Sequence, residues 1–69
     1  MIYKITAFDF NNKPIEIFYT KERGAFKCAR EMNAEEYENG VGLFRDVQVW
    51  RLNRDRETWT KYRRAMWEK

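Results

Sequence analysis

Residues 2–20, IYKITAFDFNNKPIEIFYT, decide the fold of this chain of 69 residues. Two runs rich in β-branched and aromatic residues, 2–10 and 15–20, flank the segment Asn11-Asn12-Lys13-Pro14, whose residues are typical of a turn. Asn tolerates a positive φ, and Pro cannot donate a ladder hydrogen bond, which places Pro14 at the exit of the turn. The stretch therefore predicts a β-hairpin.

A helix is expected after the hairpin, from about residue 21 to about residue 33. Thr20 offers an N-cap, and mostly small apolar residues recur at helical spacing on one face: Ala25, Cys28, Ala29 and Met32. The next residues resemble a capping box, so the helix either restarts for one turn or continues to Asn39. Gly40 and Gly42 end it.

The run LFRDVQVWRL, residues 43–52, predicts a third strand. Strand alternation places Leu43, Val47 and Val49 on one face and Phe44, Trp50 and Leu52 on the other, so neither face of the sheet looks built for water alone. Asn53 or Asp55 can then cap a last helix that continues to about residue 67.

Together these elements predict a single α+β domain over residues 1–69, in the order ββαβα. The third strand is expected beside the first, which gives a three-stranded antiparallel sheet of order 2-1-3. One helix would cover a face of this sheet, and the C-terminal helix would be an addition to it.

The composition argues against catalysis. There is no histidine, which removes the commonest general base, the usual nucleophilic triads and most transition-metal sites. The single cysteine, Cys28, lies on the apolar stripe of the first helix, so we expect it to be buried packing and not a nucleophile. No zinc or calcium pattern is present. We expect a protein that is not an enzyme and has no cofactor.

An acidic cluster occurs where the first helix is expected to end. Such a cluster can hold a hard cation, supply an acid and base pair, or imitate phosphates to a basic partner, but a solvated surface is the favoured interpretation. With one cysteine and no long apolar run, we expect a cytoplasmic protein without a disulfide or a membrane segment. The cluster consists of Glu31, Glu35, Glu36 and Glu38.

The C-terminal segment carries the strongest functional signal, because all three tryptophans lie within residues 50–67 and residues 45–69 hold eight basic and four acidic side chains. Large rings beside guanidinium groups suit base stacking, phosphate neutralisation or a protein interface. If the segment is a helix, Trp59, Tyr62 and Met66 form one stripe, which we expect to pack on the domain against Trp50. The adjacent stripe, Arg56, Thr60, Arg63 and Trp67, is the candidate contact surface, with Arg54 and Arg64 beside it. In the alternative interpretation, Trp67 extends the packed stripe and the arginines cover it.

The layout resembles the small accessory proteins of phages and mobile elements: a hairpin IYKITAFDFNNKPIEIFYT, a helix KERGAFKCARE, a strand ending DVQVWRL and a charged terminal helix. The resemblance implies a modulator or inhibitor of a host or defence protein and transfers no site. We therefore expect a non-enzymatic protein-binding module that uses the C-terminal aromatic and arginine surface. The alternative is a small nucleic-acid-binding protein that grips phosphates with the basic terminal helix. Self-association remains open.

Overall fold

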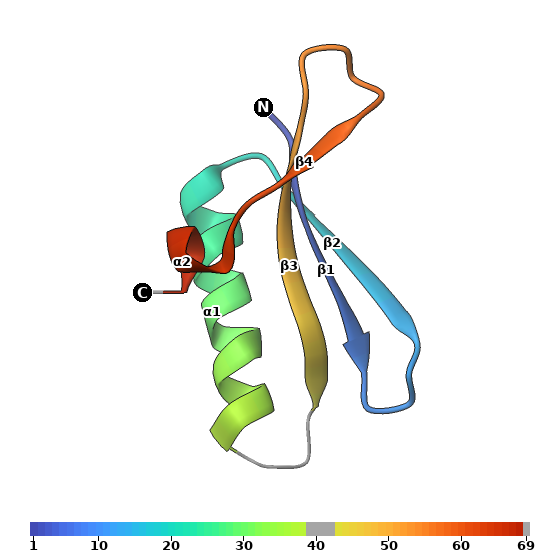
Figure 1. Cartoon of the computed structure of the whole chain (residues 1–69), viewed down its shortest axis with the longest axis vertical. Coiled ribbons are helices and arrows are strands. Elements are labelled where there is room, and N and C mark those ends of the chain that lie inside the picture. The colour runs from blue at the N-terminus through green and yellow to red at the C-terminus, as the bar shows by residue number, and fades with distance from the viewer. Residues whose placement is uncertain (39–42, 69) are drawn as a thin grey trace.

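The computed structural model describes residues 1–38 and 43–68, apart from the side chains of residues 35–38. The four strands form one antiparallel sheet in the order β2-β1-β3-β4. Both helices lie on the same side of this sheet (Figure 1). In chain order the elements are β1 (Tyr3–Asp9), β2 (Pro14–Tyr19), α1 (Glu22–Glu38), β3 (Phe44–Leu52), β4 (Trp59–Lys61) and α2 (Arg64–Trp67). The predicted α+β class and the 2-1-3 order are confirmed, with a fourth strand added beside β3.

The β1–β2 hairpin forms as predicted, and its turn is fixed by Asp9. The backbone amide of Asp9 donates to the carbonyl of Lys13 at 3.0 Å, and the Asn12 amide donates to the Asp9 carbonyl at 2.9 Å. Asn12 has a φ of 65°, a conformation that asparagine tolerates better than most residues. The Asp9 carboxylate also accepts from the amides of Asn11 and Lys13, at 2.8 and 2.9 Å.

Helix α1 packs its small residues against the sheet. Ala25 and Ala29 are fully buried, and Met32 is nearly so. Gly24 lies beneath the ring of Tyr19, where an added Cβ would stand 3.2 Å from the ring carbon Cδ1. Glycine at this position therefore permits close approach of the helix to β2. The helix continues past residue 33, in agreement with the longer of the two predicted forms.

Strand β3 supplies Val47 and Val49 to the core, both fully buried. A β-bulge interrupts its register with β1, and the residue at the bulge, Asp46, has a φ of 54°. The extra residue reverses the alternation before it, so Phe44 packs toward the core and not on the opposite face. The predicted side for Phe44 was therefore wrong.

The predicted last helix, from Asn53 or Asp55 to about residue 67, is wrong over most of its length. Residues 53–58 form a turn, and β4 then pairs with β3, placing Trp59 opposite Leu52. The Asp55 carboxylate accepts from the amides of Glu57 and Thr58 at 2.9 and 3.0 Å, which closes a turn instead of capping a helix. Arg56 has a φ of 59°, which no helix accommodates.

The short helix α2 packs on α1 and completes the core with Trp67, which is fully buried. Tyr62, in the segment before it, packs edge-on against Phe26 at 5.1 Å between ring centroids. Its hydroxyl donates to Glu22 Oε2 at 2.9 Å, and burial together with this carboxylate raises the pKa of Tyr62 to about 12. The core comprises Tyr3, Ile5, Ala7, Ala25, Ala29, Met32, Val47, Val49 and Trp67.

Other predicted features fall on the helix side of the molecule. Cys28 is half-buried against the core, with its thiol 3.9 Å from the Met32 sulfur, so the packing interpretation holds in part. Glu31 is exposed, and the side chains of Glu35, Glu36 and Glu38 lie outside the described residues, as do Asn39, Gly40 and Gly42. Within the described part, no cluster of three or more Asp, Glu, Cys or His side chains could hold a metal ion. None of its helices combines the length and the apolar composition that a membrane span requires.

Candidate functional site

Trp67, the aromatic residue of the predicted contact stripe, cannot touch a partner in this fold because its side chain is 0% exposed. Its carbonyl accepts from an Arg30 guanidinium nitrogen at 3.3 Å, and the Arg64 guanidinium lies 5.5 Å from its ring centroid. The alternative interpretation, in which Trp67 extends the packed stripe and an arginine covers it, describes this arrangement better.

The other predicted contact residues do not form one stripe, because most of the segment is not helical. Thr60 lies on β4, where its hydroxyl donates to Asn53 Oδ1 at 2.7 Å. Arg63 is exposed ahead of α2, and Arg64 pairs with Glu68 at 3.6 Å. Arg54 and Arg56 both lie in the turn between β3 and β4 and are the only two of the predicted set that the fold brings together at one surface feature.

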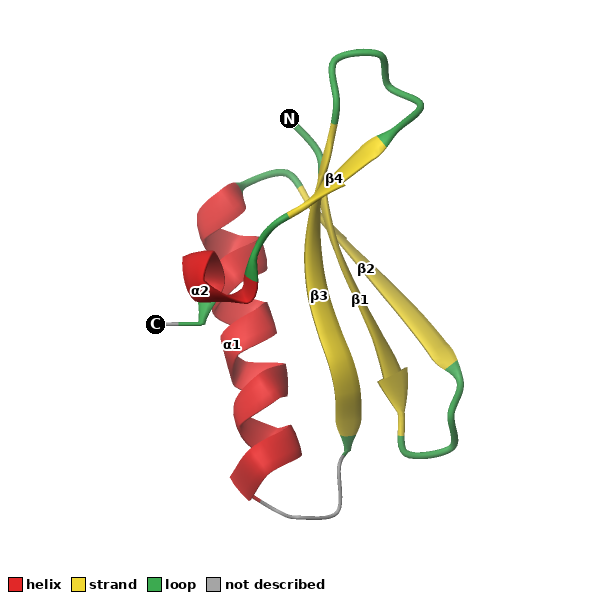
Figure 2. Cartoon of the chain, viewed as in Figure 1, coloured by secondary structure: helices red, strands yellow, loops and turns green. Residues whose placement is uncertain are grey.

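The side of the sheet away from the helices carries Phe8, Phe18, Trp50 and Trp59. Figure 2 shows both helices on one side of the sheet and no described helix or strand over the other. We call this side the open face. Strand register and alternation assign to it Lys4, Thr6, Phe8, Glu16, Phe18, Arg45, Gln48, Trp50, Leu52, Trp59 and Lys61. Trp50 was predicted to seat the last helix and instead lies here, while Met66, predicted to be packed, is 50% exposed.

Lys4 organises the centre of the open face. Its ammonium nitrogen stands 4.3 Å from the ring centroid of Trp59 and 5.8 Å from that of Trp50, and it pairs with Glu16 at 3.8 Å. The Lys4 side chain is only 17% exposed, so this cation is held by the rings and is not free for a ligand.

Hydrogen bonding and ring contacts fix the orientation of both tryptophans. The indole N–H of Trp50 donates to Thr6 Oγ1 at 2.8 Å, and Trp59 contacts Phe18 with ring centroids 6.3 Å apart. Both tryptophans keep part of their surface exposed, and Phe18 is 59% exposed. The open face thus presents preorganised rings to solvent.

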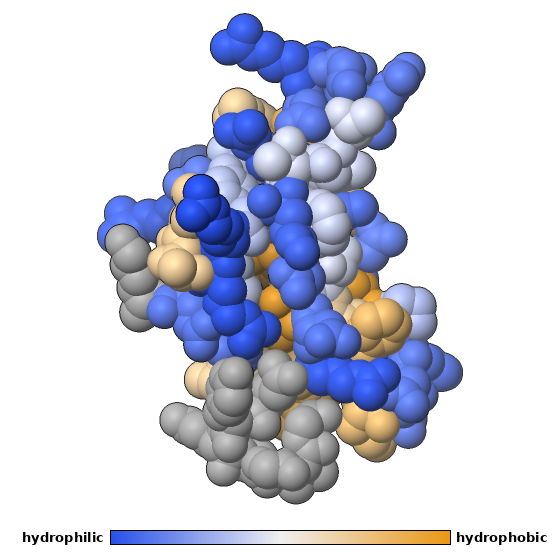
Figure 3. All heavy atoms as spheres, viewed as in Figure 1, coloured by the Kyte–Doolittle hydropathy of each residue, from blue (hydrophilic) through white to orange (hydrophobic). Residues whose placement is uncertain are grey.

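A second cation and ring pair lies toward the β1–β2 turn. The Arg45 guanidinium stands 5.4 Å from the ring centroid of Phe8. The bulge at Asp46 places Arg45 opposite Phe8 in the β1–β3 register. Figure 3 shows apolar surface near this end of the sheet, whereas the surface of the β3–β4 turn at the other end is hydrophilic.

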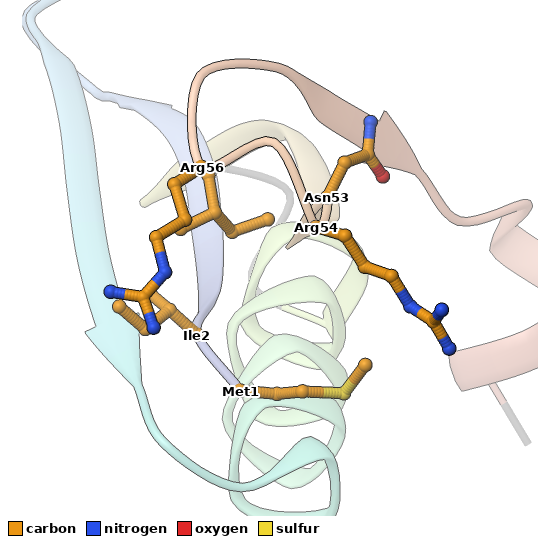
Figure 4. A pocket seen from close by; sticks show the side chains of 6 residues that line it. Met1, Ile2, Asn53, Arg54 and Arg56 are labelled. Carbon is orange, nitrogen blue, oxygen red and sulfur yellow. The ribbon is translucent and has the colours of Figure 1, made fainter.

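A shallow hollow of about 340 Å³ lies at that hydrophilic end, between the start of β1 and the β3–β4 turn. Its apolar lining includes Ile2 and Leu52, and the side chains of Arg54 and Arg56 point to opposite sides of it (Figure 4). Leu52 neighbours Trp59 across β3 and β4, so the hollow adjoins the open face.

The β3–β4 turn is held by its own polar side chains, and Asp55 is their centre. Besides the two amides, its carboxylate accepts from the Thr58 hydroxyl at 2.7 Å, and the backbone bonds lower the pKa of Asp55. Because the bonds favour the ionised form, their contribution to turn stability is present above the ordinary Asp pKa and is lost as pH falls through the lowered value.

We therefore expect Asp55→Ala to loosen the turn without unfolding the domain. In NMR spectra the amide resonances of Glu57 and Thr58 should lose their hydrogen-bonded shifts, and in the wild type the same two resonances should move at acidic pH. Glu57→Ala is the control, because that side chain is exposed. Unchanged Thr58 shifts in Asp55→Ala would show that the carboxylate does not hold the turn.

Several carboxylates in the described part of the chain already have partners. Asp9, Glu22 and Asp55 accept hydrogen bonds from neighbouring groups, and Glu16 and Glu68 lie in ion pairs. By contrast, several cations at the open face and its margins have no described carboxylate within ion-pair distance. They are Arg45, Arg54, Arg56 and Lys61. These cations are therefore not neutralised by a described carboxylate.

Comparison with family models, with curated proteins and with solved structures finds no match. The site therefore has to be judged on its own geometry. The sequence analysis expected a surface of aromatic residues and arginines on a helix and did not include Lys4, Phe8 or Phe18. Lys4, Phe8 and Phe18 all have even numbers along the two strands of the hairpin, and this alternation indicates that they share one face of the sheet.

Proposed function

We propose that the open face binds single-stranded nucleic acid, as a non-enzymatic module. The observation that carries this proposal is the set of partly exposed rings of Phe8, Phe18, Trp50 and Trp59 on an uncovered antiparallel sheet. Every base offers a π-face, and stacking on an aromatic side chain contributes about 1–3 kcal/mol per base. An antiparallel sheet with exposed rings is a platform that suits unpaired bases.

Cations that pair with no described carboxylate supply the other half of the recognition chemistry. Arg45 lies toward one end of the open face and Lys61 on its edge strand, while Arg54 and Arg56 stand at the other end, beside the hollow. A strand that crosses the rings would meet a cation at each end, where its phosphates need neutralisation. The held cation, Lys4, contributes by fixing the two tryptophans and not by contacting phosphate.

Fluorescence anisotropy with labelled oligonucleotides of about ten nucleotides tests this proposal. We expect micromolar binding of single-stranded DNA or RNA at low salt and weaker binding of a duplex of the same length, because paired bases cannot stack on the rings. Absence of binding at low salt, or a preference for the duplex, would overturn the proposal.

A protein partner is the second candidate, and the hollow favours it. Its apolar lining, with Met1 74% and Ile2 44% exposed, lies beside two arginines and would accept an apolar side chain next to a carboxylate. The expected role as a modulator or inhibitor of a host or defence protein belongs to this candidate. Ile2→Glu should then abolish capture of a stoichiometric partner that Lys27→Glu, an exposed change on α1, retains. Equal retention by both variants would remove the hollow as the contact.

A further inference from the structure

Strand β2 forms an outer edge of the sheet and, among the described strands, pairs only with β1. Exposed edges of this length offer unpaired backbone groups to another strand. Among the described residues of β2, Pro14 at the first position and the charged Glu16 are the only features that protect the edge. The opposite edge, β4, has only three residues.

The hydrogen-bonding pattern of the hairpin shows which backbone groups of β2 point away from β1. The Asp9 amide donates to the Lys13 carbonyl, so this pair is hydrogen-bonded, and antiparallel pairs alternate along the continuous register. Ile15, Ile17 and Tyr19 therefore direct their backbone groups to β1. Glu16 and Phe18 direct theirs outward, away from the sheet.

We propose that β2 pairs with β2 of a second copy of this chain, antiparallel and about a two-fold axis at Ile17, to give a continuous eight-stranded sheet. In this register Glu16 of each copy lies opposite Phe18 of the other. Each of these two pairs exchanges both of its N–H···O bonds, which uses the outward groups of both residues. We assign the partner strand to a second copy because, in this register, the outward N–H and C=O groups of one β2 meet the same groups of the other across the two-fold axis.

The side chains fit this register. On the helix side, Ile17 meets its symmetry equivalent, and Ile15 meets Tyr19; all three are only half-buried, because α1 packs more closely on β3 than on β2. On the open face, Phe18 is 59% exposed and would be covered in part. The edge carries one charged side chain, Glu16, which already pairs with Lys4 at 3.8 Å, so no uncompensated like charges face each other.

The pairing would join two open faces into one surface, with the Phe18 rings near the axis. The proposal does not depend on the nature of the ligand. A chain that dimerises but does not bind nucleic acid would support only the pairing. A chain that binds nucleic acid as a monomer would support only the proposed function.

Sedimentation equilibrium between about 1 and about 500 µM tests the pairing on the whole chain. We expect a monomer–dimer equilibrium in the wild type, retained in Phe18→Ala and lost in Phe18→Pro. Proline removes an outward donor without breaking a bond to β1, whereas alanine removes only the ring. A dimer that persists in folded Phe18→Pro would overturn the proposal.

Amide hydrogen exchange of the wild type gives a second measurement that needs no variant. The amides of Glu16 and Phe18 should become protected as concentration rises, while those of Ile15 and Ile17 are protected throughout. A chain that stays monomeric over the whole range, with Glu16 and Phe18 amides exchanging rapidly, would contradict self-pairing; this is also the result expected if a different protein supplied the strand.

Discussion

Replacing Trp67 with alanine is expected to unfold most of the protein at 25 °C. The side chain is completely buried between α2, α1 and the sheet, and truncating a buried tryptophan costs about 3–5 kcal/mol. A domain of this size rarely has more than about 3–5 kcal/mol of stability from its core. Chemical denaturation followed by circular dichroism measures the loss.

Two further variants make the Trp67 result specific. Met66→Ala, next to it but 50% exposed, should change the free energy of unfolding by no more than about 0.5 kcal/mol. Trp67→Phe should cost much less than alanine, because the indole N–H has no partner among the described groups and phenylalanine removes this buried donor. Wild-type stability in Trp67→Ala would mean that α2 does not dock on α1.

Replacing Trp59 with alanine is expected to weaken oligonucleotide binding about tenfold, since one stacked base contributes about 1–3 kcal/mol. The residue is half-exposed on a short edge strand, so the fold should persist. Trp59→Phe keeps a ring and should keep most of the affinity. Anisotropy titration measures both. If alanine and phenylalanine bind as tightly as the wild type, Trp59 is a structural clamp for Lys4 and does not stack on bases.

The hairpin, α1 and β3 could be predicted because their patterns are local. The β-branched and aromatic runs at 2–10 and 15–20, the turn residues at 11–14 and the small apolar residues at helical spacing each indicate one element type. The bulge at Asp46 could not be predicted, since nothing in the local pattern requires an extra residue there. It moved Phe44 to the core and placed Arg45 over Phe8.

The C-terminal segment shows where local patterns were insufficient. Asp55 can cap a helix or close a turn with the same side-chain hydrogen bonds. In the structure it closes a turn, and the residues that follow pair with the edge of β3 as β4. Because most of this segment is not helical, Arg56, Thr60, Arg63 and Trp67 do not form the predicted stripe. The residue types proposed for binding remained, but strand alternation, not helical spacing, placed Trp59 on a surface.

The salt dependence of binding tests the central claim, that the open face binds single strands, most directly. Log affinity should fall linearly with log salt, and each phosphate contact contributes about 0.7 to the slope. Arg45→Ala/Lys61→Ala removes two cations of the open face that pair with no described carboxylate, and Arg23→Ala/Lys27→Ala removes the same residue types from exposed positions on α1. We predict that the first pair reduces the slope by about 1.4 and the second leaves it unchanged. Equal slopes for the two double variants would contradict the account.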